Sequence, residues 1–180
     1  MAKFLYSAAM SLDGFIAGPA GDMSWLGDYS GPNPLVDGLI SRTGALLTGA
    51  RTFGGDDPNA GGPGEGEAFG GGWDGPEFVL TRHPPVPAPP GVTFVSDLDA
   101  AIATSGAAAG DRYVNILGAN VAAQCLLAGV LDEVVISVVP ILLGDGTRLF
   151  DHPGGHTARL EQVDVTHTST VANLWYHVIR

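Results

Sequence analysis

Three short stretches of the sequence carry side chains that could bind a phosphate group. Each follows an apolar run typical of a buried strand: Thr48 to Thr52, Thr81 to His83, and Gly118 to Asn120. The first two offer hydroxyl and guanidinium donors. The third opens a predicted helix, whose free backbone N–H groups and dipole favour an anion. Because ligands gather beyond the carboxyl ends of parallel strands, all three stretches could meet one ligand.

The distribution of positive charge supports this interpretation. The chain has eight Lys and Arg residues, and two of them, Arg51 and Arg82, stand at predicted strand ends. Several anion sites together favour a dinucleotide, and the planar fork of Arg fits a ribose 2′-phosphate, which favours NADPH over NADH. Two alternatives stay open: both Arg side chains could be surface charges, and Gly118 could simply form a tight turn. No Gly-x-Gly-x-x-Gly fingerprint follows a strand, so a standard Rossmann turn is not expected.

Strand and helix signals alternate along most of the chain, which predicts an α/β fold. The segment 113–139 has the pattern strand, helix, strand, and such a βαβ unit has parallel strands. We therefore expect a mixed, mostly parallel sheet with helices on both faces and an antiparallel C-terminal hairpin. The expected strands are 3–10, 45–48, 77–81, 92–95, 113–117 and 134–139, with two hairpin strands over 158–180, and the expected helices are 33–43, 96–109 and 120–128.

Residues 54–76 differ in composition from the rest of the chain. Ten of these 23 residues are Gly, five are Asp or Glu, and none is Lys or Arg. The flanking strands are too short to form separate cores, so we expect a single domain, 1–180, that contains a loop at this point. The loop is too acidic to cradle a phosphate. A lid over a site and a plain flexible excursion both fit its composition.

The overall charge disfavours several classes of function. With 19 Asp and Glu against eight Lys and Arg, the 180-residue chain has a net charge of −11, which disfavours nucleic acid and anionic membranes as partners. A single cysteine, Cys125, rules out an internal disulfide and a thiolate metal cluster, and the His spacing predicts no metal site. The chain shows no signal-peptide features and no apolar run long enough to span a bilayer, so a cytoplasmic protein is expected.

Six motifs follow one another along the chain: SLDGFIA (11–17), LTGART (47–52), FVLTR (78–82), LGA (117–119), LLAGVLDE (126–133) and PILLGDGTRLF (140–150). In this order they resemble the dihydrofolate reductase-like superfamily. The resemblance is to the branch that includes the reductase domain of bacterial riboflavin biosynthesis proteins. It runs from the first strand to the last and is most specific between Leu126 and Phe150.

The resemblance implies a dihydrofolate reductase-like three-layer sandwich, NADPH as cofactor, hydride transfer to a small heterocycle and, often, a homodimer. It also assigns cofactor contacts by matching position. They are Gly49, Arg51 and Thr52 for the phosphates, Thr81 and Arg82 for the 2′-phosphate, Gly118, Ala119, Asn120 and Val121 for the pyrophosphate, and the backbone at Ala8 and Ala9 for the nicotinamide.

Reduction of a heterocycle also needs a proton source, and a carboxyl group near the nicotinamide is the usual one. Asp13 follows the first strand at the end where the nicotinamide would lie, although Asp13-Gly14 also fits a plain turn. The run up to Pro58 resembles the riboflavin-pathway segment that ends in Asp-Asp-Pro and supplies an acid on the substrate side. Asp57 is therefore the second catalytic candidate and Asp56 a substrate-side residue, with a solvated turn as the alternative. Trp25 could stack on the substrate or belong to the core.

Two positions depart from the family pattern. Ala50 stands where a basic residue is common. Ala119 replaces the second glycine of the pyrophosphate turn, where a methyl is a serious obstacle only at positive φ. The leading hypothesis is an NADPH-dependent reductase of a pyrimidine- or pterin-like heterocycle, including a 5-amino-6-ribosylaminouracil-type compound.

Two rival hypotheses stay open. The first is a dinucleotide- or ligand-binding protein of the same fold without turnover, which the two departures favour. The second is a structural module without a nucleotide site, which would require Arg51 and Arg82 to form ion pairs within the fold.

Overall fold

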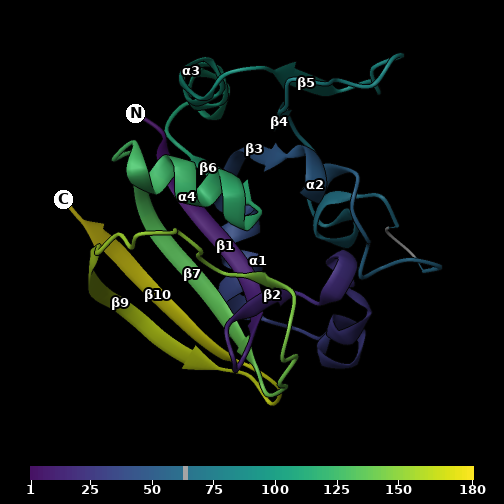
Figure 1. Ribbon diagram of the computed structural model, residues 1–180, viewed down its shortest axis with the longest axis vertical. Helices are drawn as coiled ribbons and strands as arrows, with labels where there is room; N and C mark the ends of the chain where they lie inside the picture. The colour runs from purple at the N-terminus through teal and green to yellow at the C-terminus, as the bar shows by residue number, and fades with distance from the viewer. Residues whose placement is uncertain (63–64) are drawn as a thin grey trace.

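The computed structural model describes residues 1–62 and 65–180, and its centre is one sheet of eight strands (Figure 1). The strands lie in the order β5-β4-β3-β6-β1-β7-β10-β9. All neighbours from β5 to β7 are parallel, and β10 is antiparallel to both β7 and β9. The mixed, mostly parallel sheet and the C-terminal hairpin are therefore confirmed. The strands are β1 (Lys3–Ser11), β3 (Thr43–Gly49), β4 (Glu77–Leu80), β5 (Val92–Val95), β6 (Tyr113–Leu117), β7 (Leu131–Val139), β9 (Arg159–His167) and β10 (Ala172–Ile179).

The N-terminal strand β1 occupies the middle of the sheet. Phe4, Leu5 and Tyr6 are all buried, because a central strand of a sheet covered on both faces has no solvent side. The βαβ unit predicted over 113–139 is present, with α4 as its helix. Its strands β6 and β7 do not touch each other, because β1 lies between them.

Helices cover both faces of the sheet. Ala101 of α3 and Val121 of α4 belong to the larger apolar cluster on one face, whereas Leu39 of α1 packs on the other face with Leu5 and Val135. Figure 1 shows α4 in front of the sheet, α1 behind it and α3 at the top of the view. The three-layer sandwich is confirmed. The helices are α1 (Pro34–Arg42), α3 (Leu98–Ala109) and α4 (Ala119–Leu127). No helix among the described residues is long and apolar enough to cross a bilayer.

The predicted helix 96–109 begins two residues later, and several short elements were not predicted. Asp97 caps α3, because its carboxylate accepts the N–H of Ala100 over 2.9 Å. Elements of two to six residues are too short to show a periodic pattern, and the pairing of β2 with β8 joins segments far apart in the sequence. The additional elements are β2 (Phe15–Ala17), β8 (Thr147–Arg148), α2 (Ala50–Phe53), and the 3₁₀ segments η1 (Pro19–Gly21), η2 (Ser24–Tyr29) and η3 (Ala68–Gly71).

Candidate active site

The three predicted anion-binding stretches meet at the edge of the sheet where the parallel strands end. Thr48 of β3 pairs in register with Leu117 of β6, and Gly49 pairs with Leu80 of β4. A Cβ at Gly49 would lie 3.2 Å from Cγ2 of Val121 on α4, so the backbone of β3 approaches this helix closely. The stretches are neighbours because β4, β3 and β6 are adjacent parallel strands.

The turn between β6 and α4 requires glycine at one position. Gly118 has a φ of +101°, and a Cβ there would overlap the side chain of Thr52 on α2. Ala119 is the first residue of α4 and does not have a positive φ. A methyl group is a serious obstacle in this turn only at positive φ, so the methyl group of Ala119 does not strain it.

An open groove of about 430 Å³ lies beside the N-terminus of α4. Arg51, Asn120 and Arg148 line it and can donate hydrogen bonds, and Asp145 and Asp151 line it as well. Because a glycine precedes α4, no side chain caps the first N–H groups of this helix. Free N–H groups, the helix dipole and two guanidinium groups together make this end of the groove suitable for a phosphate.

Arg148 is a groove residue that the sequence analysis did not single out. It lies on the two-residue strand β8, and its guanidinium carbon is 4.6 Å from the centroid of the Phe15 ring, a contact that holds the cation beside the groove. In the sequence Arg148 lies within the 140–150 motif, on which the family resemblance rests. Unlike Arg51 and Arg82, it does not follow a predicted strand. The pairing of β8 with β2 brings it to the site.

The central strands β1 and β6 separate at the same edge. β1 pairs with β6 only as far as Tyr6, but it pairs with β7 as far as Ser11. Among the described strands, the backbone from Ser7 onward therefore has no partner on the β6 side. Burial changes at the same point, because Ser7 to Met10 are half-buried whereas the preceding three residues are buried. Ala8 and Ala9, predicted to face the nicotinamide, lie in this opening and have small side chains.

Thr81 and Arg82 follow β4 farther along the edge. The Thr81 hydroxyl accepts the N–H of His83 over 3.1 Å, which shapes a turn, and Arg82 is exposed. Within residues 1–62 and 65–180, neither Arg82 nor Arg51 takes part in an ion pair. The structural-module hypothesis required both residues to do so, and these contacts give it no support.

Asp13 is held in a network that keeps it ionised. Its carboxylate accepts the hydroxyl of Ser11 over 2.6 Å and the N–H groups of Leu143 and Gly144 over 3.1 and 2.7 Å. These bonds, the Ser11 bond most of all, lower the pKa of Asp13 to about 2. A carboxylate this acidic is a poor proton donor at neutral pH. Its contacts join the end of β1 to the loop that lines the groove.

The adjacent acids Asp56 and Asp57 also bind backbone groups. Asp57 accepts N–H groups of Gly66 and Asn59, and these bonds, the Gly66 bond first, lower its pKa. Asp56 accepts the N–H of Met23 over 2.9 Å, which ties the Gly-rich loop to the segment before η2. These hydrogen bonds are the ones expected if the two acids simply form a turn. The catalytic role of Asp57 and the substrate-side role of Asp56 stay predictions.

Two further side chains carry polar groups, of which Trp25 is buried and Glu77 half-buried. Trp25 on η2 is 9% exposed, and its indole Nε1 has no hydrogen-bond partner in the described part of the chain. Glu77, at the start of β4, has a pKa raised by burial, partly offset by the nearby hydroxyl of Thr48. In the sequence Glu77 is simply the first residue of a predicted strand, and no local pattern marks it as a site residue. The raised pKa follows from tertiary burial.

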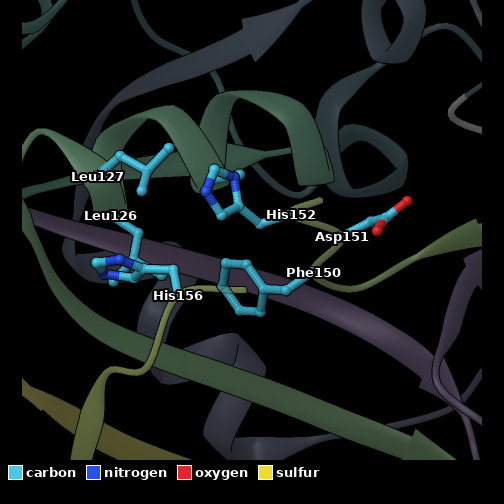
Figure 2. A pocket seen from close by; sticks show the side chains of 7 residues that line it. Leu126, Leu127, Phe150, Asp151, His152 and His156 are labelled. Atoms are coloured by element: carbon cyan, nitrogen blue, oxygen red, sulfur yellow. The ribbon is translucent and has the colours of Figure 1, made fainter. Parts of the chain in front are cut away.

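A second hollow lies between α4 and the segment that follows β8 (Figure 2). Its volume is about 50 Å³, and Leu126, Phe150, His152 and His156 are among its lining residues. The two His rings are 6.2 Å apart between centroids, and no cluster of three or more possible metal ligands is present in residues 1–62 and 65–180. This hollow is too small to hold a nucleotide.

A comparison with known families decides the affiliation of the chain. The profile described as "RibD C-terminal domain" matches residues 2–174. The chain belongs to the RibD C-terminal domain family. This agrees with the resemblance seen in the sequence motifs. No curated protein sequence is a significant match.

Solved structures show the same fold. A Shewanella sp. PV-4 protein assigned to riboflavin biosynthesis is 27% identical, with a TM-score of 0.76 and 100% of both chains covered. The Thermotoga maritima diaminohydroxyphosphoribosylaminopyrimidine deaminase/5-amino-6-(5-phosphoribosylamino)uracil reductase is 18% identical (TM-score 0.69), with 99% of this chain and 57% of that chain covered. Enterococcus faecalis dihydrofolate reductase, complexed with NADP(H), is 15% identical (TM-score 0.63), with 98% and 96% covered. Membership of the RibD C-terminal domain family supports a reductase of the riboflavin pathway, and the solved structures support the fold.

Proposed function

We propose that the protein is an NADPH-dependent oxidoreductase that transfers a hydride to a small pyrimidine- or pterin-like heterocycle. The observation that carries this proposal is the separation of β1 from β6 at the same edge of the sheet as a groove with phosphate donors. A nicotinamide and a phosphate site must lie side by side to hold one dinucleotide. The compound named for the Thermotoga relative, 5-amino-6-(5-phosphoribosylamino)uracil, is a suitable first substrate to test.

The residues present fit the cofactor. The Gly118 turn would let the backbone come close to the pyrophosphate of the cofactor. The N-terminus of α4, together with Arg51 and Arg148, would hold that pyrophosphate. Thr81 and Arg82 would hold the 2′-phosphate, and the unpartnered backbone around Ala8 would face the nicotinamide. When bound, NADPH supplies the hydride.

The proton reaches the substrate from solvent water in this proposal. Asp13 is ionised at neutral pH, and Asp57 has a lowered pKa, so neither carboxyl holds a proton to give. Asp13 contributes by fixing the loop that lines the groove, since its carboxylate binds two N–H groups of that loop. An ordered water molecule that donates a hydrogen bond to the carboxylate of Asp13 or Asp57 can carry this proton to the substrate.

Cofactor choice is tested by titrating the protein with NADPH and with NADH while following tryptophan fluorescence. We expect saturable NADPH binding, with binding of NADH weaker by about tenfold or more, because one charge-assisted phosphate contact contributes on the order of 1.5–3 kcal/mol. Arg82→Ala should remove this preference and leave NADH binding unchanged. Equal affinity of the wild type for both nucleotides would contradict the assignment of Arg82.

A second candidate function is ligand binding without turnover. It is favoured by the hydrogen bonds that hold both predicted acids ionised. The two functions are separated by mixing NADPH-loaded protein with pyrimidine and pterin substrates and following NADPH absorbance. Oxidation of NADPH with any of them supports the reductase, whereas tight NADPH binding without oxidation across the whole panel supports the binding protein.

A further inference from the structure

The groove beside α4 has two walls that come from different parts of the chain. One wall belongs to α2 and α4, and its charged donor is Arg51. The other wall is formed by residues 144–148, which we name the loop wall, and its charged donor is Arg148. A pyrophosphate in the groove would contact both walls, so its affinity depends on how firmly each wall is held in place.

The loop that carries the loop wall is fixed to the segment that follows β1. The N–H of Leu12 donates to the carbonyl of Ile141 over 2.8 Å, and the N–H of Leu149 donates to the carbonyl of Gly14 over 3.0 Å. These two backbone hydrogen bonds lie on either side of the loop wall. The loop is therefore attached to the end of β1 both before and after the residues that line the groove.

Asp13 adds a side-chain attachment between these two backbone bonds. Its Oδ1 accepts the N–H of Leu143 over 3.1 Å, and its Oδ2 accepts the N–H of Gly144 over 2.7 Å, at the place where the loop wall begins. An asparagine would offer one oxygen in place of two, and its nitrogen would face the second N–H as another donor. The two bonds together therefore require a carboxylate at this position.

Phe15 holds the charged end of the loop wall. It is buried, it pairs with Arg148 between β2 and β8, and its ring centroid lies 4.6 Å from the guanidinium carbon. Asp145 and Asp151 line the same groove, but Arg148 forms no ion pair in the described part of the chain. The charge of this exposed guanidinium is therefore available to an anion in the groove.

We propose that Asp13 is a positioning residue for cofactor binding, which together with Phe15 sets where Arg148 meets the phosphate groups. The carboxylate of Asp13 holds the loop wall, and Arg148 makes the contact with the ligand. The inference rests on the proposed function, because it takes the groove as the place of the pyrophosphate. It gives the ionised carboxylate at the end of β1 a task in binding.

The test is a pair of double-mutant cycles in which calorimetry measures the affinities for NADPH and for inorganic pyrophosphate. Asp13→Asn and Arg148→Met should each weaken both ligands by about tenfold. The double variant should lose no more than Arg148→Met alone, because Asp13 acts through Arg148. Arg51→Met, on the opposite wall, is the matched partner, and its loss should combine with that of Asp13→Asn to about a hundredfold.

The direction of the Asp13→Asn effect separates position from charge. Removal of a negative charge beside the groove would by itself raise the affinity for an anion, so a fall in affinity reports a displaced loop wall. Phe15→Leu disturbs Arg148 without touching Asp13, and it should show the same coupling to Arg148→Met even if Asp13→Asn fails to fold. Asp97→Ala removes a carboxylate that accepts a backbone N–H at the start of α3, and it should bind both ligands normally.

Three results would overturn the proposal. They are pyrophosphate affinity unchanged in Asp13→Asn or Phe15→Leu, a double variant with Arg148→Met whose loss is the product of the two single losses, and no pyrophosphate binding by the wild type. Pyrophosphate binding with the expected coupling, but without NADPH binding, would keep the positioning role of Asp13 and reject the proposed function.

Discussion

Asp13 illustrates, at the scale of a residue, how a side chain suited to catalysis can be committed to structure. It follows β1 at the expected place, but three donors surround its carboxylate. Each donor stabilises the ionised form, so the pKa falls and the group loses its value as an acid. Glu77 shows the opposite effect, because burial raises the pKa of its carboxyl. Position in the sequence indicates only part of this, because the Ser11 hydroxyl is two residues from Asp13, whereas the N–H groups of Leu143 and Gly144 and the burial of Glu77 come from other parts of the fold.

Replacement of Asp13 by Asn should destabilise the protein in a pH-dependent way. The folded-state pKa of about 2 is below the ordinary value for Asp, so the carboxylate stabilises the fold above that ordinary value, and this contribution is lost as the pH falls towards 2. Urea unfolding of the wild type and Asp13→Asn should therefore differ at pH 7 and converge in acid. A constant difference at all pH values would show that the ionised form has no special role.

The β6–α4 turn is the element that positions the candidate phosphate site. Gly118 provides the positive φ, and the side chain of Thr52 on α2 fills the space where a Cβ would project. The turn therefore packs against α2, and Arg51 of α2 and Asn120 of α4 line one groove. Ala119 takes no part in this close approach.

Gly118→Ala should weaken both folding and cofactor binding. The strained φ and the overlap with Thr52 should lower the free energy of unfolding by about 1–3 kcal/mol, and the shifted N-terminus of α4 should weaken NADPH binding by about tenfold or more. The matched variant Ala119→Gly should bind NADPH within about twofold of the wild type, because a glycine at a helical φ changes little at a helix start. Chemical unfolding and fluorescence titration measure both effects. Normal binding by Gly118→Ala would show that the turn does not hold the cofactor.

At the scale of the whole molecule, the edge of the sheet where the parallel strands end differs from the edge where they begin. The carboxyl edge is open and carries the candidate site, whereas the amino edge is closed around Glu133 of β7. This carboxylate is 1% exposed and accepts from Lys3, Tyr113 and Trp175 over 2.9, 2.9 and 2.8 Å. Burial alone would raise the pKa of Glu133, but the hydrogen bonds outweigh it and the pKa is lowered. The contacts link β1, β6 and β10 to β7.

Glu133→Gln should lower the free energy of unfolding at pH 7 by about 3–5 kcal/mol, because an amide would face donors that have lost their buried partner charge. The lowered pKa means that wild-type stability falls as the medium becomes more acidic than the ordinary range for Glu, so the two proteins should converge there. Arg180→Ala removes an exposed ion pair with Asp132 and should cost less than about 1 kcal/mol. A cost for Glu133→Gln as small as that control would contradict the network.

The outer strand β9 is the edge of the sheet at which a homodimer would be expected to form. Leu160 and Val165 are 50% and 49% exposed on an edge strand of nine residues. Such edges pair readily with another chain, and the family resemblance led us to expect a homodimer. Size-exclusion chromatography with light scattering should give twice the mass of the chain, and Leu160→Lys combined with Val165→Lys should give a monomer. A wild type that is monomeric at high concentration would reject the expectation.

The sequence by itself determined the order and type of the main elements. Strand runs around Tyr6, Leu47 and Ile116 are apolar, and glycine at Gly118 and Gly129 marks turns, so local patterns were sufficient to predict an α/β fold and to place the candidate anion-binding stretches at its strand ends. The motif between 126 and 150 was sufficient to indicate the family. These features depend on residues near one another in the chain.

Only the tertiary structure decided which groups meet. Arg148 reaches the groove because β8 pairs with β2, and the Asn115 amide and the Thr48 hydroxyl become buried donors because β6 and β3 lie side by side. The separation of β1 from β6 after Tyr6 follows from strand register, which no local pattern contains. The lowered pKa of Asp13 depends first on the nearby hydroxyl of Ser11, but also on N–H groups 130 and 131 residues away. Burial and hydrogen bonding across such distances arise only when the chain has folded.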